Sequence, residues 1–528
     1  MPSATARLQS VVAVIASTLA AGVLGLASNM LMASVFGRSL ATDAFFMAQS
    51  VLRIFGKFFQ GGPLRQIAMP IFMEKRQADA DGAERYASNL ISATACVFGV
   101  LAAGLWLAAP HVVAAIAPGF AGGQEALTVR LTRLFVPVIL CTVLINLLTT
   151  FLHAFHRFGP SEWLARVPSA AMIAALLWGR GRWPIESLAW ALLIGSALQT
   201  ALLWDALRRQ GFRYRPLLQL RQPELAATGR RLAPFFGSSM VVQLQLVVHR
   251  VVASTQPAGT LSSLSYADRI TQFLDTVIGV VPLVLFPRFI EDALQADRTA
   301  FRRRLERVAL LCSLGVFPMV VAVIVFSRPL IQLLLERGRF DQLATDQTAL
   351  SLAWLSVGLL AWIIWGICKS AAYALQEPRI VNIAVIGISL TTSAITWGLG
   401  RAWGLAGLAI SSALVPFLMS AAYFWLLRRS VPELYRIVWN GAFFRITVAA
   451  AGMAGACWWL RDQVWGSWFA GTGWPVRLGG LAALSGAGVL VYWLLLAVLR
   501  VEARQEFRSL LWRALRVSWQ KPAATACT

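Results

Sequence analysis

Charged residues are scarce in this chain. Only 13% of its 528 residues are Asp, Glu, Lys or Arg, whereas 58% are hydrophobic and the mean hydropathy is +0.66. A soluble domain of ordinary composition is charged at about a quarter of its positions. The deficit argues against a soluble protein and predicts a chain that is embedded in a membrane.

Residues typical of cofactor and metal sites are also scarce. The 6 cysteines are scattered without a CxxC pair, and the 4 histidines have no metal-ligand spacing. This pattern argues against a disulfide framework and against a zinc site. No GxxxxGK[ST] phosphate loop is present, and no cluster of carboxylates suits metal or base chemistry. We therefore predict no metal, no cofactor and no catalytic residues, which is not the profile of an enzyme.

Long apolar runs occupy most of the sequence. A membrane-spanning helix needs about 20 mostly apolar residues, and the first run is too long for the apolar core of a signal peptide. The predicted spans are 9–36, 42–72, 86–109, 127–154, 161–179, 184–206, 232–254, 260–290, 304–327, 346–376, 380–400, 404–427, 441–460 and 475–499. The fold class is thus an all-α polytopic membrane protein of about fourteen transmembrane helices.

The distribution of basic residues predicts the orientation. The chain has 47 Lys and Arg against 24 Asp and Glu. The basic residues cluster after even-numbered spans, as at Lys75-Arg76, Arg208-Arg209, Arg302–Arg304 and Arg428-Arg429. Cytoplasmic loops carry such an excess, so both termini are predicted to be cytoplasmic. Contact of these loops with anionic membrane lipids explains the net charge of +23 without a nucleic-acid partner.

The sequence repeats itself weakly at an offset of about 220 residues. Ala33-Ser34 corresponds to Ala253-Ser254, and Gly119-Phe120 to Arg339-Phe340. The offset covers six spans, so both copies face the same way, as in transporters with two lobes related by a pseudo-two-fold axis along the membrane normal. The predicted division is an N-lobe at 1–206, a basic linker at 207–231, a C-lobe at 232–427, two further helices within 428–499 and an amphipathic basic tail at 500–528.

Two of the spans carry polar stripes that are costly inside a membrane. The second and eighth spans are equivalent under the repeat, and the polar residues of each fall on one helical face. The stripes are Ser50, Arg53, Lys57 and Gln60 in one, and Ser262, Ser265, Arg269, Gln272 and Thr276 in the other. Ionisable residues inside spans are functional candidates. Two facing stripes, each with a cation, suit a central cavity for an anionic group such as a pyrophosphate.

Several other polar residues leave two interpretations open. Arg250 and Lys369 either line the cavity or extend along the helix towards lipid headgroups, and the second is favoured for His249. Asp43 is either a cavity residue or an N-terminal cap of the second span. Asp268 is either functional or held in a structural salt bridge.

Several segments resemble the MurJ/MviN family of lipid II flippases, which belongs to the MOP exporter superfamily. The similar segments are Val35-Phe36-Gly37 with Ala41–Phe46, Ala117–Phe120, Ser265–Arg269 with Leu285-Phe286-Pro287, Arg337–Phe340 and Val357-Gly358-Leu359. The resemblance implies two six-helix lobes plus two C-terminal helices that form a groove for a lipid tail. It also implies transport of lipid II, an undecaprenyl-linked peptidoglycan precursor, from the cytoplasmic to the periplasmic leaflet of the bacterial inner membrane by alternating access.

The sequence departs from the family pattern at the cavity. Ser28 stands where an arginine is expected, Gly56-Lys57 replaces a basic pair, and Gln272 replaces an acidic residue. The stripes and the resemblance together predict a substrate-binding set of Arg269, Lys57, Arg53, Ser28, Gln272, Asp43, Ser265 and Arg250.

Alternative functions stay open at this point. One is transport of another lipid-linked glycan, for an exopolysaccharide or a capsule. Another is a non-transporting membrane scaffold for cell-wall synthesis enzymes, which are candidate partners. An exporter of cationic drugs is disfavoured, because a cationic cavity repels such drugs.

Overall fold

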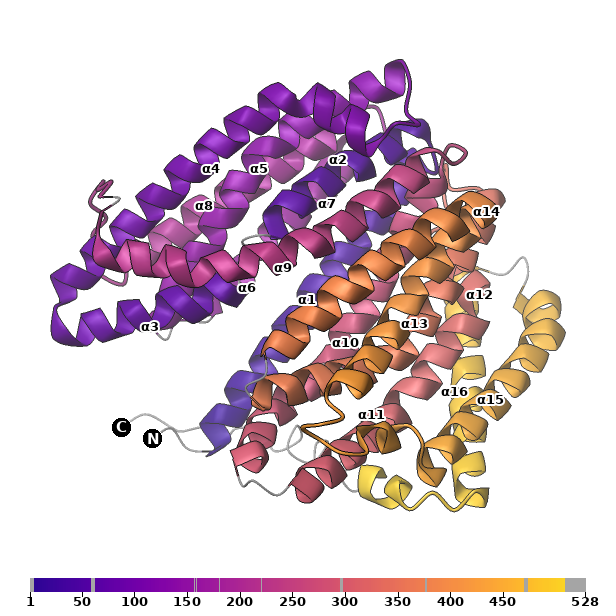
Figure 1. Cartoon of the computed structure of the whole chain (residues 1–528). Coiled ribbons are helices and arrows are strands. Elements are labelled where there is room, and N and C mark those ends of the chain that lie inside the picture. Colours follow the sequence, from indigo (N-terminus) through magenta and orange to yellow (C-terminus); the bar gives the residue numbers. More distant parts are fainter. Residues whose placement is uncertain are drawn as a thin grey trace, which may run out of the picture. The chain divides into compact units, whose positions relative to one another are not determined.

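The computed structural model describes residues 4–57, 62–155, 157, 159–179, 181–219, 221–294, 298–375, 378–469 and 473–508. Throughout this described part the secondary structure is helical, and no strand occurs in it (Figure 1). Each of the fourteen predicted spans coincides with one or two of these helices. The prediction of an all-α polytopic membrane protein is therefore confirmed.

The chain divides into two compact units, and each unit combines segments that are distant in sequence. Unit 1 comprises residues 1–277, 334–351 and 385–412, and unit 2 comprises 278–333, 352–384 and 413–528. The division into lobes proposed from the sequence uses other boundaries and stays a prediction.

Unit 1 begins with the helices of the first half of the chain. They are α1 (Ala4–Phe36), α2 (Leu40–Lys57), α3 (Gly62–Ala78), α4 (Ala80–Ile116), α5 (Gly123–Ala154), α6 (Gly159–Leu164), α7 (Val167–Gly179), α8 (Glu186–Arg208) and α9 (Pro223–Ser254). Helix α5 packs against α2, α4 and α8, and α7 packs against α1 and α8. The first part of α10 (Thr260–Leu294) completes the region in which the candidate site lies.

The remaining helices belong wholly or partly to unit 2. They are α11 (Arg298–Val325), α12 (Ser327–Leu334), α13 (Gln342–Ala374), α14 (Pro378–Leu426), a 3-10 helix η1 (Leu434–Ile437), α15 (Gly441–Leu460), a π-helix η2 (Arg461–Phe469) and α16 (Trp474–Val498). The backbone of α14 is non-helical at Gly404, where φ is +55°. This break lies at the boundary between the predicted spans 380–400 and 404–427.

The fifth predicted span, 161–179, is formed by two helices. A turn at Ala165-Arg166 divides α6 from α7, and Pro168 follows it. Proline is the residue least compatible with a helix interior. The prediction of a single helix was wrong here, because mean hydropathy does not register a proline. The second predicted span, 42–72, covers α2 and α3, and the residues between these two helices lie outside the described part of the chain.

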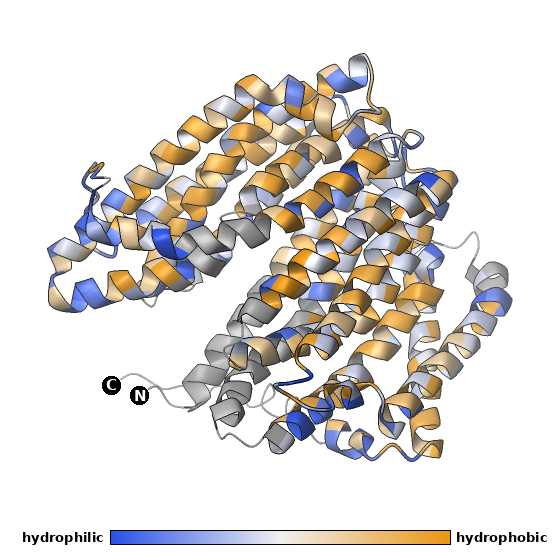
Figure 2. Ribbon diagram, in the orientation of Figure 1, coloured by the Kyte–Doolittle hydropathy of each residue, from blue (hydrophilic) through white to orange (hydrophobic). Residues whose placement is uncertain are grey.

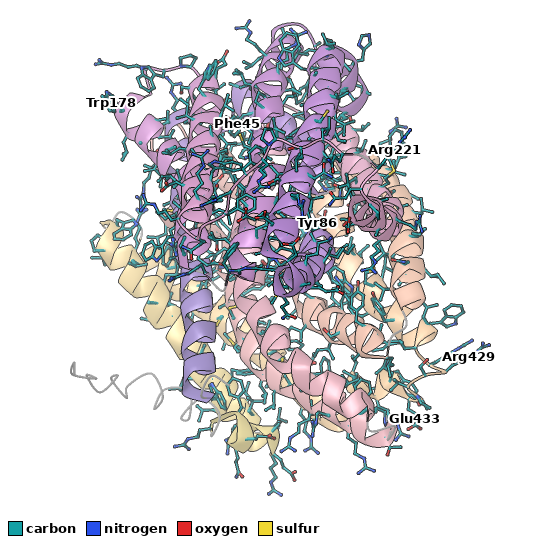
Figure 3. All side chains as sticks on the ribbon, turned by 90° about the vertical axis from the view of Figure 1, so that its left-hand side faces the viewer. Phe45, Tyr86, Trp178, Arg221, Arg429 and Glu433 are labelled. Carbon is teal, nitrogen blue, oxygen red and sulfur yellow. The ribbon has the colours of Figure 1, made fainter. Side chains whose placement is uncertain are left out.

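Hydropathy along the described helices agrees with a membrane environment. Eight segments are long and apolar enough to cross a bilayer: 80–116, 123–154, 186–208, 301–325, 342–374, 381–426, 441–465 and 474–498. Shorter apolar stretches occupy 20–36 and 240–254. Apolar residues are frequent along these helices (Figure 2). Trp178, at 82% exposed, projects away from α7 (Figure 3), as expected of a side chain that contacts lipid or its headgroups.

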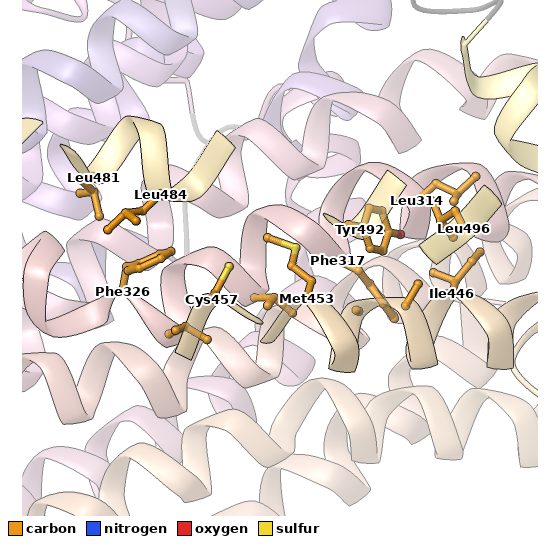
Figure 4. Packing of buried hydrophobic residues seen from close by; sticks show 14 of the residues in the cluster. Leu314, Phe317, Phe326, Ile446, Met453, Cys457, Leu481, Leu484, Tyr492 and Leu496 are labelled. Carbon is orange, nitrogen blue, oxygen red and sulfur yellow. The ribbon is translucent and has the colours of Figure 1, made fainter. Parts of the chain in front are cut away.

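The core of unit 2 is a seam of close contacts among α11, α15 and α16. Phe317, Met453 and Tyr492 each contribute a buried side chain from a different helix (Figure 4). Gly488 allows α16 to approach α15, because a Cβ at this position would overlap the Cys457 sulfur. Small residues at such crossings let transmembrane helices pack tightly.

Candidate functional site

The candidate site lies within unit 1, where α2, α9 and α10 bring ionisable side chains together. We use the name charged cluster for Arg53 of α2, Arg250 of α9, and Asp268 and Arg269 of α10. Arg53 Nη1 lies 3.5 Å from Asp268 Oδ2. The charges of Arg53, Asp268 and Arg269 all act on Arg250. Asp268 thus forms an ion pair with Arg53, and its charge also acts on Arg250 and Arg269.

Neighbouring amides extend the cluster along α2 and α10. Gln272 donates from Nε2 to Asp268 Oδ2 at 2.7 Å, and Arg269 donates to the Gln49 side chain. Arg53 also lies 3.5 Å from the Ser50 hydroxyl. The structure therefore brings together Arg53, Arg250, Arg269 and Gln272 of the predicted set, and gives Asp268 the salt bridge that the sequence analysis offered as one interpretation.

The guanidinium groups of the cluster keep unused hydrogen-bond donors. Arg250 is 4% exposed, and its Nε and Nη1 have no partner among the described residues. Arg53 Nε is also buried and has no hydrogen-bond partner among the described residues. A buried donor without an acceptor is costly, and an oxyanion with several free lone pairs satisfies such donors in charge-assisted hydrogen bonds. The arrangement suits binding of a multiply charged anion.

Asp43 has a different position, away from the charged cluster. Its carboxylate is 2% exposed and accepts hydrogen bonds from the backbone N–H groups of Gly259 at 2.5 Å and Ser262 at 2.7 Å. Asp43 thus caps the N-terminus of α10. One interpretation of the sequence was a cap on its own helix α2, because sequence alone does not show that a carboxylate reaches a helix more than 200 positions away.

The other predicted residues have local or undescribed surroundings. The Ser28 hydroxyl donates to the Gly25 carbonyl of its own helix at 2.8 Å. Ser265 is 2% exposed, and its hydroxyl has no hydrogen-bond partner in the described part of the chain. Lys57 is the last residue of α2, and its side chain lies outside the described residues. The structure does not place Ser28 in the charged cluster.

Four turns of unit 1 approach one another closely, and we call them the interlocked turns: 37–39, 117–122, 255–259 and 335–341. Arg339 N donates to the Ser34 carbonyl at 2.9 Å, and Gly119 N donates to the Ser254 hydroxyl at 3.3 Å. Glycine is required at this approach, because a Cβ at Gly119 would overlap the Ser254 carbonyl.

The contacts of the interlocked turns are reciprocal. Ser34 and Ser254 are equivalent positions of the sequence repeat, and so are Gly119 and Arg339. Each serine contacts the turn from the other half of the chain, which is the pattern that a two-fold relation produces. Phe46 and Tyr266 are also equivalent, and their rings meet edge-to-face at 5.1 Å. Equivalent positions of the weak sequence repeat, on α2 and α10 and on the turns, thus contact each other in the structure.

Comparisons with known proteins give consistent results. The family model described as lipid II flippase MurJ matches residues 32–479. Lipid II flippase MurJ of Burkholderia cenocepacia is 27% identical over 452 residues, which cover 84% of this chain and 88% of the relative. The probable lipid II flippase MurJ of Vibrio cholerae is 26% identical, with 94% of this chain and 97% of the relative covered.

Solved structures support the same fold. A structure described as lipid II flippase MurJ in an inward closed conformation matches with a TM-score of 0.75 and 20% identity, covering 96% of this chain and 99% of that one. An inward-facing multidrug resistance MATE family transporter of the MOP superfamily matches with a TM-score of 0.59 and 16% identity, covering 80% and 96%. At these identities the likeness concerns the fold.

Proposed function

This chain belongs to the lipid II flippase MurJ family, and from this premise we propose that it moves lipid II from the cytoplasmic to the periplasmic leaflet of the bacterial inner membrane. The observation that carries the proposal is the charged cluster, in which the charge of one carboxylate, Asp268, acts on three arginines in spans that the sequence predicts. Uncompensated charge is costly at that depth, and a diphosphate supplies the missing negative charge and acceptors.

We propose that Arg250 contributes to substrate binding in this chain. The sequence has a serine at position 28 and a glutamine at position 272, where the family resemblance implies charges. Arg53 and Arg250 supply positive charge from α2 and α9 instead. Arginine suits this role because its planar guanidinium group binds phosphate oxygens in pairs.

The transport cycle we propose is alternating access, with the interlocked turns on the periplasmic side. The predicted orientation supports this assignment, because the turns follow odd-numbered spans and the basic clusters follow even-numbered ones. Both termini are then cytoplasmic. In this arrangement the interlocked turns close the periplasmic side, and their contacts must separate for the substrate to leave. Cell-wall synthesis enzymes are the partners we expect on the product side.

Rescue of cells depleted of their resident lipid II flippase tests this function. Wild type, Arg269→Ala, Arg250→Gln and the control Arg130→Gln are compared at matched membrane levels. Arg130 is 71% exposed and pairs with Glu186 outside the charged cluster. We expect rescue by wild type and by the control, and a loss of at least tenfold in viable cells for the two cluster variants.

The other outcomes each contradict part of the proposal. Well-expressed wild type that does not rescue argues against lipid II as cargo and favours another lipid-linked glycan. Rescue by wild type and by Arg269→Ala alike supports transport of lipid II but argues against a role of Arg269 in binding it. Rescue by Arg250→Gln, with failure of Arg269→Ala, removes only Arg250 from the substrate site.

A further inference from the structure

A pocket of about 350 Å³ lies in unit 2 at the C-terminal end of α16, the yellow helix of Figure 1. The chain turns at this point, where Arg500 has a φ of +53°. We call it the headgroup pocket. Its lining residues are Leu490, Trp493, Leu494, Ala497, Arg504, Gln505 and Arg508. Apolar residues of a membrane-spanning helix thus meet basic residues just beyond its end.

The apolar half of the headgroup pocket is a lipid-facing surface of α16. Leu490 and Leu494 are 61% and 58% exposed. They are four residues apart, and Ala497 follows three residues later, so all three share one helical face. Tyr492 and Leu496, on the opposite face, are buried in the contact with α11 and α15. Acyl chains therefore have access to this half of the pocket.

The basic half is held in place by packing. The Phe507 ring lies 5.9 Å from the Trp493 ring and contacts α11 near Gly315. Glu506 pairs with Arg307 of α11 at 2.7 Å. The segment that carries Arg504 and Arg508 is thus docked on unit 2 by the residues between them, and is not a free tail.

The two arginines of the pocket have no ion-pair partner among the described residues. No ion pair to Arg504 or Arg508 is formed by the residues that the structure describes, and the adjacent Glu506 is engaged by Arg307. The arginines are four residues apart in a helical turn, so both guanidinium groups lie on the same side. Two such groups at the level of the lipid headgroups match a phosphate and attract anionic lipid.

We propose that the headgroup pocket binds one anionic phospholipid of the cytoplasmic leaflet. Arg504 and Arg508 hold its phosphate, and an acyl chain lies along Leu490 and Leu494. The basic residues of this site are not those of the charged cluster of α2, α9 and α10, and its occupant in this proposal is a lipid of the membrane and not the cargo. A zwitterionic phospholipid fits less well, because its ammonium group approaches the same two arginines.

Photolabelling of the full-length protein tests the site. The protein is placed in phosphatidylcholine nanodiscs that contain a small fraction of diazirine-labelled phosphatidylglycerol or, separately, diazirine-labelled phosphatidylcholine. Labelled peptides are then identified by mass spectrometry. We expect phosphatidylglycerol to label the peptide that contains residues 490–497 at least fivefold more than phosphatidylcholine does.

Matched variants sharpen the test. The double variant Arg504→Gln with Arg508→Gln should reduce phosphatidylglycerol labelling of this peptide to the level of phosphatidylcholine. Arg429→Gln should leave it unchanged, because Arg429 is an exposed arginine of unit 2 outside the pocket (Figure 3). Labelling of peptides from α4, on unit 1, reports whether each variant is folded.

Three outcomes overturn the proposal. The first is equal labelling by the two lipids, and the second is unchanged labelling in a folded double variant. The third is displacement of phosphatidylglycerol by an equal amount of a polyprenyl diphosphate, which would assign the pocket to the path of the transported lipid.

Discussion

At the scale of single residues, Asp43 illustrates how one carboxylate connects two distant helices. Both of its oxygens accept backbone N–H groups at the start of α10. We expect Asp43→Ala to lower the free energy of unfolding by about 1–3 kcal/mol, because two buried donors lose their acceptors. The thermal unfolding midpoint of the detergent-purified protein measures the change.

A matched control separates this effect from a general loss of charge. Asp81 is 65% exposed, and its contact with Arg215 is long, at 3.5 Å. Exposed pairs of this kind contribute about 0–1 kcal/mol, so Asp81→Ala should unfold within about a degree or two of wild type. Equal midpoints for Asp43→Ala and wild type would contradict the capping role.

Part of the charged cluster could be predicted from the sequence. The spacing of Arg53, Arg269 and Gln272 on two polar stripes predicted that they belong together, and the structure places them within one cluster. The sequence did not decide where the Arg250 side chain lies, because a position near the end of α9 is compatible with a cavity and with the lipid headgroups. Its 4% exposure and its proximity to the other arginines depend on how three helices pack, which no local pattern reports.

At the scale of elements, the interlocked turns depend on glycine for two different reasons. Gly338 has a φ of +61°, and a Cβ there would also overlap the Ser34 carbonyl. Gly122 has a φ of +56° but open space around its Cα. We expect Gly122→Ala to cost about 1–2 kcal/mol of backbone strain, and Gly338→Ala to cost more, because the turn must also shift. Thermal unfolding of the two variants compares the costs, and equal destabilisation would show that the close contact has no energetic role.

An ion pair links α3 to the first turn of α9 and makes stability depend on pH. Lys75 Nζ lies 2.6 Å from Glu224 Oε1, and this hydrogen bond lowers the pKa of Glu224 below its ordinary value. The folded state then binds the proton less readily than the unfolded state does. The stabilisation is present above about pH 4.5, and it is lost as the pH falls through the lowered pKa.

The pH dependence is measured by a double-mutant cycle. Both side chains are nearly a third exposed, so screening limits the coupling energy to about 1 kcal/mol or less. Unfolding midpoints of wild type, Lys75→Met, Glu224→Gln and the double variant should reveal coupling at pH 7 that decreases as the pH is lowered towards 3. Coupling of the same size at both values would contradict an ionic contribution.

Element boundaries show where sequence reasoning was sufficient and where it was not. Long apolar runs predicted helices such as α4, α5 and α16, because burial in lipid requires a continuous hydrogen-bonded helix. The division of α6 from α7 was missed, since a window of average hydropathy does not register a proline. The break at Gly404 was recovered because Arg401 and the neighbouring glycines interrupt the apolar run.

At the scale of the whole molecule, the repeat was visible in sequence only as scattered matches. Its meaning becomes clear in the reciprocal contacts of Ser34 with Arg339 and of Ser254 with Gly119. These contacts join residues that are distant in the chain, so they depend on the complete packing of unit 1. Sequence predicted that equivalent positions exist, but not that equivalent turns would bind each other.

The interlocked turns give the proposed transport cycle a direct test. Pro118 and Thr255 are exposed and lie on neighbouring turns, since Gly119 approaches the Thr255 Cα. We introduce Pro118→Cys with Thr255→Cys and join the two thiols with a short, reducible bis-thiosulfonate reagent. If these turns must separate for lipid II to leave, cross-linking should abolish rescue of flippase-depleted cells, and a reductant should restore it.

The single variants control for the reagent itself. Each carries one introduced thiol together with the exposed native Cys96, so neither can form the cross-link between the turns, and both should rescue with and without the reagent. Cross-linking is scored by a shift in electrophoretic mobility after cleavage between the two positions. Full cross-linking with undiminished rescue would show that the turns stay closed throughout transport. This result would contradict the proposal that the substrate leaves by separation of the interlocked turns.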